Sequence, residues 1–336
     1  MTNLLSPELK NLLGTLGAYK GRYALGCLFM ACTDAGQLAV PWLVGRVVDG
    51  LAAHRLDAAG VSRYAGLIVL AALVVAAGRL GWRAYIFGTA RRLDRDLRQR
   101  LYEHLQGLSI DFHLRHKVGD LMAHATNDIQ AVRAVAGEGV MSGWDAFAMA
   151  VGAAGMVIST VDWRLGVVAL SPLLLLPVFT YMLGQRLHRS YAEVQGAFAL
   201  VSDRAQEGFA GIRVVKGFAR EGHQLALFAE ANEAYRAAYA RMSRFEVASD
   251  PVVGLLAGVS FAVGLLYGGH MVLTGQLSVG QYVAFNSFLG MIVWPMLAVG
   301  WSMNLFQRGA ASMGRLQKIF AETPSVADGP LALPTP

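Results

Sequence analysis

The chain has 336 residues, of which 55% are hydrophobic and 15% are charged. A soluble domain of this length carries about 25% charged residues, so the composition excludes a surface that faces only water. The deficit is concentrated: from Val247 to Gln307 there is one acidic residue, Asp250, and no Lys or Arg. Lipid is therefore expected to be the solvent for part of the chain.

The net charge of +6 does not indicate nucleic acid as a partner, because the basic residues cluster between apolar runs. Clusters in those places are typical of segments next to a cytoplasmic leaflet. Two cysteines, Cys27 and Cys32, lie in an apolar run and are interpreted as buried small side chains. No His or Cys spacing fits a metal site, so no metal is expected.

The first 22 residues have amphipathic spacing and lack an early long apolar core. They predict a helix at the membrane interface and not a cleavable signal peptide. Six apolar runs of about the 20 residues needed to cross a bilayer follow. They cover approximately residues 23–47, 64–90, 135–160, 164–184, 248–272 and 279–306. Pro172 and Pro177 lie in the fourth run and are expected to be tolerated, as in other membrane helices.

The distribution of Lys and Arg predicts the orientation of these six spans. The N-terminal piece, residues 91–133, residues 186–244 and the C-terminal end hold 23 of these residues, and the opposite connections hold 3. Because cytoplasmic segments carry the excess of positive charge, both termini are predicted to be cytoplasmic. The plasma membrane is the expected location.

The two internal connections are each longer than 40 residues and have helical composition. Leucines recur at 93, 97, 101, 105 and 108, which is a helical stripe. Unstructured loops of that length are uncommon. The fold class is therefore all-α, with six membrane helices that extend into the cytoplasm and form two helical hairpins.

Each hairpin tip carries a motif. The first tip contains Phe112, Gly119, Asp120, Leu121, Asp128, Val132 and Arg133. The second contains Glu207, Gly211, Ile212, Arg213, Val214, Val215, Lys216, Phe218, Arg220 and Glu221. With these motifs and six spans, the chain resembles the transmembrane domain of ATP-binding-cassette exporters of the bacterial multidrug and lipid half-transporter type. His124 and Asp111 depart from that family's usual Arg and Phe.

The resemblance implies that each tip is a coupling helix that docks into a nucleotide-binding domain. The residues implied in coupling are Phe112, His113, Arg115, Gly119, Asp120, Glu207, Gly211, Ile212, Arg213 and Val215. Phe112 and Ile212 are expected to present apolar side chains to that domain, and Gly211 to permit a sharp turn. The resemblance also implies a dimer of half-transporters, identical or different, that exchange their fourth and fifth helices.

Polar and aromatic residues inside the spans are candidates for a substrate cavity, because ionisable groups at membrane depth usually face a bundle interior or water. The candidates are Asp34, Gln37, Arg79, Trp82, Arg83, Asp145, Asp250, Trp294 and Trp301. Structural Asp–Arg pairs or snorkelling side chains are the alternative interpretation.

No segment fits the phosphate-binding pattern G-x-x-x-x-G-K-[ST], so no catalytic residue and no cofactor are expected in this chain. ATP and Mg²⁺ are expected in an associated nucleotide-binding domain. Residues 1–22 are interpreted as the interfacial helix, 23–320 as the transmembrane domain and 321–336 as a linker toward that domain. A truncated gene product is favoured over a split gene.

The sequence thus predicts the membrane subunit of an ATP-driven exporter of an amphipathic drug, lipid or peptide. A channel or secondary transporter that does not use ATP is the alternative, and a membrane scaffold whose hairpins bind a partner is another.

Overall fold

The computed structural model describes residues 7–160 and 162–325, without the side chains of residues 7, 160, 177, 249 and 250. Nearly all of that part is helical, and it contains no β-strand. The α-helices are α1 (Pro7–Gly17), α2 (Lys20–Ala52), α3 (Ala58–Trp82), α4 (Gly88–Gly107), α5 (Ile110–Arg115), α6 (Val118–Ala123), α7 (Ile129–Ala134), α8 (Val140–Thr160), α9 (Trp163–Leu170), α10 (Leu175–Ala210), α11 (Ile212–Gly217), α12 (Glu221–Leu273) and α13 (Val279–Phe320). Three π-helical turns, η1 (Arg83–Phe87), η2 (His124–Asp128) and η3 (Val135–Gly139), join successive α-helices without interrupting the rod.

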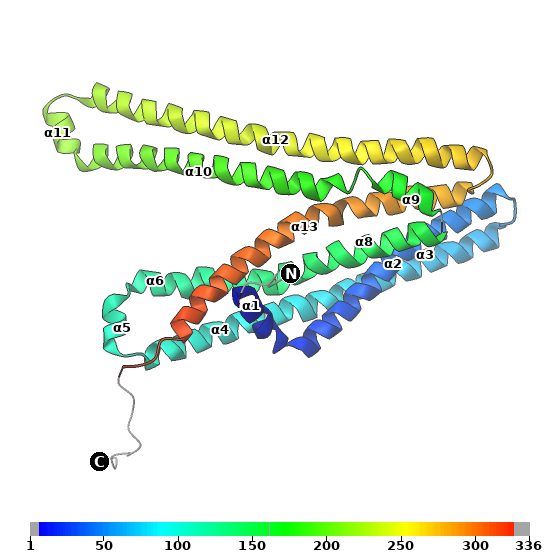
Figure 1. Cartoon of the computed structure of the whole chain (residues 1–336), viewed down its shortest axis with the longest axis horizontal. Coiled ribbons are helices and arrows are strands. Elements are labelled where there is room, and N and C mark those ends of the chain that lie inside the picture. The colour runs from blue at the N-terminus through cyan, green and yellow to red at the C-terminus, as the bar shows by residue number, and fades with distance from the viewer. Residues whose placement is uncertain (1–6, 161, 326–336) are drawn as a thin grey trace, which may run out of the picture. The chain divides into compact units, whose positions relative to one another are not determined.

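The described residues form two compact units, each considered by itself. The first contains the chain up to Gly166 and from Tyr267 onward, and the second is Val167–Leu266. In the first unit, α2 packs on α3, and α13 packs on both α2 and α8 (Figure 1). In the second, α10 and the greater part of α12 form a long hairpin closed by α11 (Figure 1).

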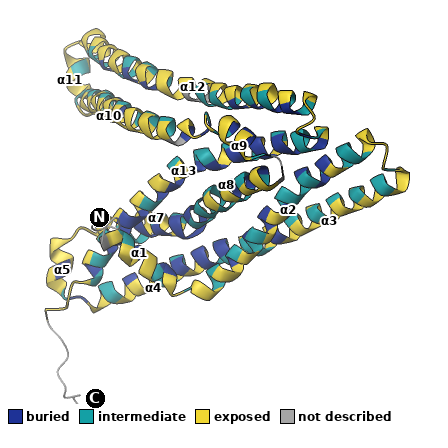
Figure 2. Ribbon diagram, turned by 45° about the vertical axis from the view of Figure 1, so that its right-hand side comes forward, coloured by how far each residue is buried: buried dark blue, intermediate teal, exposed yellow. Residues whose placement is uncertain are grey.

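Five helical stretches of the described chain are long and apolar enough to cross a membrane, judged by length and composition. They are Lys20–Ala52, Ala58–Gly107, Val118–Ser159, Glu221–Leu273 and Val279–Phe320. Within α3, Gly78 is buried while Val69, Leu73 and Leu80 are exposed. Most of this helix is exposed or half-buried (Figure 2). A helix that is apolar all round is stable when lipid surrounds it.

The predicted fourth span is not one continuous helix. Helix α9 ends at Leu170, a turn follows, and α10 begins at Leu175. In a continuous α-helix Pro172 would have no N–H to donate, and its ring would clash with the carbonyl of the preceding turn. In this turn Ser171 Oγ donates to the carbonyl of Val168 at 2.9 Å, which satisfies one helix-end acceptor. Among the described residues, the fourth predicted span is therefore divided into two helices, and the count of six continuous helices is not confirmed.

The first external connection is shorter than the 16 residues between the predicted runs 23–47 and 64–90. Helix α2 continues to Ala52 and α3 begins at Ala58, so the connection is residues 53–57. His54 in it has φ 50°, a left-handed conformation that reverses the chain in few residues. Asp57 then caps α3 by accepting a 2.7 Å hydrogen bond from the Gly60 amide.

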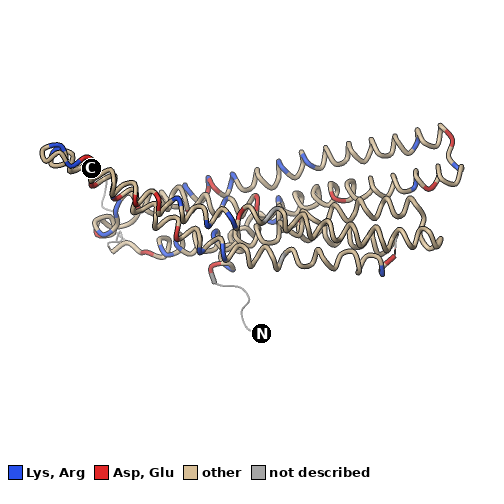
Figure 3. The backbone as a smooth tube through the Cα atoms, turned by 90° about the horizontal axis from the view of Figure 1, so that it is seen from above, with Lys and Arg blue, Asp and Glu red and all other residues tan. Residues whose placement is uncertain are grey.

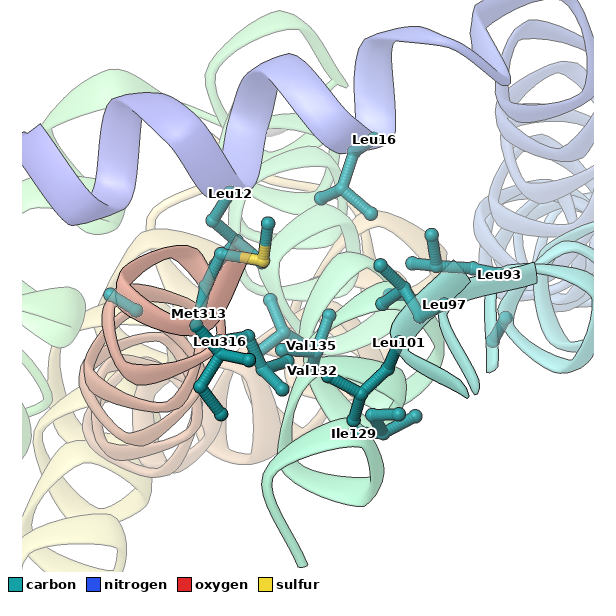
Figure 4. Packing of buried hydrophobic residues seen from close by; sticks show 14 residues of the cluster. Leu12, Leu16, Leu93, Leu97, Leu101, Ile129, Val132, Val135, Met313 and Leu316 are labelled. Carbon is teal, nitrogen blue, oxygen red and sulfur yellow. The ribbon is translucent and has the colours of Figure 1, made fainter. Parts of the chain in front are cut away.

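The largest described apolar core lies within the first hairpin and the helices packed on it, mostly outside the six apolar runs predicted from the sequence. It joins α1, α4, α7, η3 and α13 (Figure 4). The leucine stripe predicted from the sequence contributes Leu93, Leu97 and Leu101, each 4% exposed or less. Leu12 of α1 is completely buried against this core. The polar extensions therefore have an apolar core of their own, which stabilises them as helices.

Charged residues gather toward the hairpin tips in both units, whereas the apolar lengths of the helices carry few of them (Figure 3). The prediction of two helical hairpins is confirmed: α4 and α6 flank α5 at the first tip, and α10 and α12 flank α11 at the second.

Candidate functional site

The first tip is the six-residue helix α5, and Phe112 lies on its inner side. The Phe112 side chain is 4% exposed. Its ring stacks on His116 with centroids 4.1 Å apart and meets His113 edge-on at 5.5 Å. His113 Nε2 also lies 3.1 Å from the carbonyl oxygen of Leu105 in α4. Phe112 therefore anchors the tip to its own hairpin and does not present apolar surface, which corrects the role expected for it.

The exposed apolar residues of the first tip are Ile110 and Leu114, at 74% and 79% exposure. They are four residues apart and so share one face of α5. Around them, Arg115 Nε donates to the carbonyl of Asp111 at 3.2 Å, and Gly119 and Asp120 are exposed. In the sequence, Ile110 and Leu114 are an apolar pair at helical spacing, which could have indicated this exposed face. The family motif contains Phe112 and neither of these two residues.

The second tip begins at Gly211, where α10 ends and α11 starts. Its φ and ψ are −88° and 12°, a conformation open to other residues, so the expectation that glycine is needed for backbone freedom is wrong. The position is tight for another reason. A Cβ there would lie 3.1 Å from the carbonyl oxygen of Glu207, which also accepts the Gly211 amide at 2.9 Å.

The second tip exposes more apolar surface than the first. The exposed apolar side chains are Phe209, Ile212, Val214 and Phe218, whereas Val215 is half-buried and Arg213 is exposed. Exposed ion pairs flank them: Lys216 with Glu221 at 3.0 Å, and Arg204 with Glu207 at 2.9 Å. Clustered exposed apolar side chains, including aromatic ones, with a charged border are typical of protein-binding sites. The second tip has this composition.

A carboxylate outside the six apolar runs predicted from the sequence joins the first hairpin to the end of α13. Asp128 in η2 accepts from Arg315 Nε at 3.1 Å and from Arg315 Nη2, and His124 Nδ1 lies 2.6 Å away. Arg315 also donates to Ser312 Oγ at 2.9 Å. Burial alone would raise the pKa of Asp128, but the hydrogen bonds from Arg315 and His124 outweigh it and hold the pKa below its usual value.

No local sequence pattern indicates this cluster, because its two sides lie 187 positions apart. In the sequence, His124 is a departure from the family pattern and Asp128 is a motif residue. The structure gives them a common partner in Arg315. Movement of the C-terminal end of α13 is thereby tied to the first hairpin.

Among the candidates within the spans, the structure brings three charged residues together. Asp34 of α2 is 7% exposed and accepts a 2.8 Å hydrogen bond from Trp144 Nε1. Asp145 of α8 lies within electrostatic range of both Asp34 and Arg79. Gln37, one turn after Asp34, is half-buried. Trp144 was missed from sequence, although a half-buried indole N–H needs an acceptor.

The other candidates do not join this group in the described contacts. Arg83 lies over the ring of Trp82, 5.5 Å from its centroid, and is exposed. Trp294 and Trp301 of α13 are exposed. The side chain of Asp250 lies outside the described residues.

Two described cavities, of about 970 and 580 Å³, are lined by residues other than these candidates. Within the described part of the chain, no group of three or more His, Cys, Asp or Glu could hold a metal ion.

Comparison with known proteins places these features in a family. Residues 23–296 match the family model for the ABC transporter transmembrane region. The chain is 35% identical over 298 residues to the multidrug resistance-like ATP-binding protein MdlA of Escherichia coli, a match that covers 89% of this chain and 50% of that protein. It is 31% identical over 323 residues to the probable multidrug resistance ABC transporter ATP-binding/permease protein YheI of Bacillus subtilis, covering 95% and 55%.

A third relative is the ATP-dependent lipid A-core flippase of Syntrophus aciditrophicus, 26% identical over 331 residues, covering 97% of this chain and 54% of that protein. The chain thus spans about half the length of the curated relatives it matches.

Proposed function

Because the chain belongs to the ABC transporter transmembrane region family, we propose that it carries an amphipathic substrate across the plasma membrane by ATP-driven alternating access. It is a multi-pass membrane protein of the exporter type. The observation that carries the proposal is the pair of tips: short helices with exposed apolar side chains, held at the ends of polar helical hairpins. A channel that does not use ATP would not need apolar docking surfaces at the ends of its hairpins.

The tips are proposed to dock on nucleotide-binding domains that bind ATP and Mg²⁺. Ile110 and Leu114 on the first tip, and Ile212 and Val214 on the second, supply the apolar contacts. Charged residues next to these apolar side chains, such as Arg115 on the first tip and Glu221 beside the second, keep the undocked tips soluble. Closure of those domains around ATP would move the tips, and rigid helices would carry the movement to the membrane.

A second half-transporter, identical or different, is proposed as the partner. The second unit presents exposed apolar side chains along much of α10 and α12, among them Val178, Phe198, Leu255 and Leu266. Exchange of this unit between two copies would cover that surface. The termini are proposed to be cytoplasmic, with residues 1–22 at the interface, 23–320 as the transmembrane domain and 321–336 leading toward the nucleotide-binding domain; residues 326–336 lie outside the described part.

The substrate is proposed to meet the group formed by buried Asp34, half-buried Asp145 and exposed Arg79. Charges of both signs beside Trp144 suit an amphipathic molecule with a polar head. Trp294 and Trp301 are proposed to contribute apolar contact from α13, and their exposure in a single chain leaves them accessible to a ligand.

The experiment that tests this function uses the protein as its gene encodes it, in inside-out membrane vesicles, with Hoechst 33342 as the probe. Accumulation that requires hydrolysable ATP and stops with orthovanadate supports the exporter. Probe movement that is independent of ATP favours a channel or secondary transporter. Absence of movement for this and a panel of lipid and peptide probes, together with partner binding by the hairpins, would favour a scaffold and refute the proposal.

A further inference from the structure

The larger described cavity lies at the end of the first unit opposite its hairpin tip. It has a volume of about 970 Å³ and opens between the last turns of α2, the start of α3 and the start of α13. Its lining includes two cations, Arg46 and Arg55, and one acid, Asp49. The volume is in the range of ligand sites, which is roughly 300–1,000 Å³.

Asp49 is hydrogen-bonded to the start of α13. Its Oδ2 accepts from Ser278 Oγ at 2.7 Å, and its Oδ1 accepts from the Gly280 amide at 2.7 Å. The carboxylate therefore compensates the N-terminus of α13. Among the described residues, neither Arg46 nor Arg55 has an ion pair within 4.0 Å.

Arg46 is held in a way that leaves its donors available. Its guanidinium lies over the ring of Trp42, 5.0 Å from the centroid. Stacking uses the face of the guanidinium, so the N–H groups on its edge remain free to bind a planar or tetrahedral oxyanion. Tyr64 and Ser159 add hydroxyl groups to the same lining. The cavity is consequently a polar, positively charged recess with unused donors.

The surroundings favour an anion attached to lipid. From Tyr64 at the cavity, α3 continues through Leu67 and Leu70, three residues apart and both exposed. Residues at this spacing share a helix face, so an apolar track leads away from the recess along a helix that lipid surrounds. Arg and Trp side chains at the end of an apolar span lie at headgroup depth.

We infer that this cavity binds an anionic, phosphate-bearing group, with Arg46 and Arg55 as the recognition residues. The inference rests on the proposed function only for the leaflet at which the cavity lies, which would be the outer one. A phosphodiester headgroup and a free phosphate ester share the chemistry that would be recognised, and the experiment separates them.

The test uses the purified full-length protein in detergent and native mass spectrometry of its lipid adducts. Phosphatidylglycerol is compared with phosphatidylcholine of the same acyl chains, whose headgroup has no net charge. Binding of phosphatidylglycerol is expected to be about threefold to tenfold weaker in Arg46→Gln and in Arg55→Gln, because each loses one charge-assisted contact. Arg46→Lys keeps the charge but not the fork of donors, and is expected to lie between wild type and Arg46→Gln.

Arg164→Gln is the matched control. Arg164 lies over the ring of Trp163 at 5.7 Å, so it reproduces the Arg46 stack, but it does not line the cavity. Its substitution is expected to leave phosphatidylglycerol binding unchanged. Equal loss in Arg164→Gln, or equal binding in all variants, would overturn the inference. A fold check by size-exclusion chromatography and thermal unfolding accompanies each variant.

Thermal stabilisation by glycerol 3-phosphate identifies the source of the phosphate. Stabilisation that disappears in Arg46→Gln and Arg55→Gln assigns the site to a soluble phosphate ester. Phosphatidylglycerol binding without that stabilisation assigns it to a lipid headgroup. Because none of these measurements uses ATP, failure of ATP-dependent transport would refute the proposed function and leave this site intact, whereas failure of anion binding would leave the proposed function intact.

Discussion

Replacing Arg315 by Gln removes the cation that pairs with Asp128 and should lower the free energy of unfolding. The Asp128 side chain is 9% exposed and would keep its charge with only His124 and Ser312 as hydrogen-bond partners. Hydrogen bonds to charged groups contribute about 1.5–3 kcal/mol. Since the Arg315 side chain is 50% exposed, solvent screening reduces the expected contribution to about 1–2 kcal/mol.

A double-mutant cycle isolates that contribution. Arg315→Gln and Asp128→Asn are each expected to destabilise the protein, and the double variant to be less destabilised than their sum by about 1–2 kcal/mol. The pKa of Asp128 is held below its usual value, so this stabilisation is complete above that value, about 3.9, and is lost only as the pH falls through the lowered pKa. A cycle at pH 7 therefore measures all of it.

Thermal unfolding in detergent at one scan rate provides the readout, with an expected shift of a few degrees for each single variant. Arg308→Gln is the control, because Arg308 is exposed on α13 and has no ion pair among the described residues. Additive single effects, or an equal shift in Arg308→Gln, would refute the reasoning that Asp128 ties the hairpin to α13.

Two further substitutions test packing and capping. Leu12→Ala should lower stability by about 2–5 kcal/mol, because Leu12 is completely buried in the hairpin core, while Leu13→Ala on the exposed side of α1 should change it little; equal shifts in melting temperature would contradict the placement of α1. Ser278→Ala should cost about 1–2 kcal/mol, because its hydroxyl caps α13 by accepting from the Gln281 amide at 3.1 Å. Ser287→Ala, on the exposed side of the same helix, is its control, and a smaller loss for Ser278→Ala than for Ser287→Ala would contradict the cap.

The hairpins could be predicted because their signal is local and periodic. The leucines at 93, 97 and 101 repeat every helical turn, and the structure buries all three in one core. The continuity of the fourth span could not be predicted in the same way. Hydropathy favours an unbroken helix there, but Pro172 removes a backbone donor, and the chain breaks into α9 and α10.

The tips show a second limit of prediction from sequence, which concerns the orientation of side chains. A motif marks Phe112 and Ile212 alike, but whether a side chain points toward its own hairpin or away from it depends on the orientation of a six-residue helix. In α5 that orientation buries Phe112 and exposes Leu114. Local sequence patterns do not predict the contact of Asp128 with Arg315. The two residues are 187 positions apart, and their contact depends on how α13 packs against the first hairpin.

Coupling through the second tip is tested by measuring ATP hydrolysis and probe transport by Ile212→Asp in the same vesicles. Ile212 is 45% exposed at the second tip, and Tyr102→Asp, at 64% exposure on α4, introduces the same charge away from it and away from the second unit. We expect Ile212→Asp to hydrolyse ATP without transport, as should Gly211→Pro, which loses the amide donor to Glu207, whereas Tyr102→Asp should do both. Transport at the wild-type rate by Ile212→Asp and Gly211→Pro would contradict the assignment of this tip as the coupling surface.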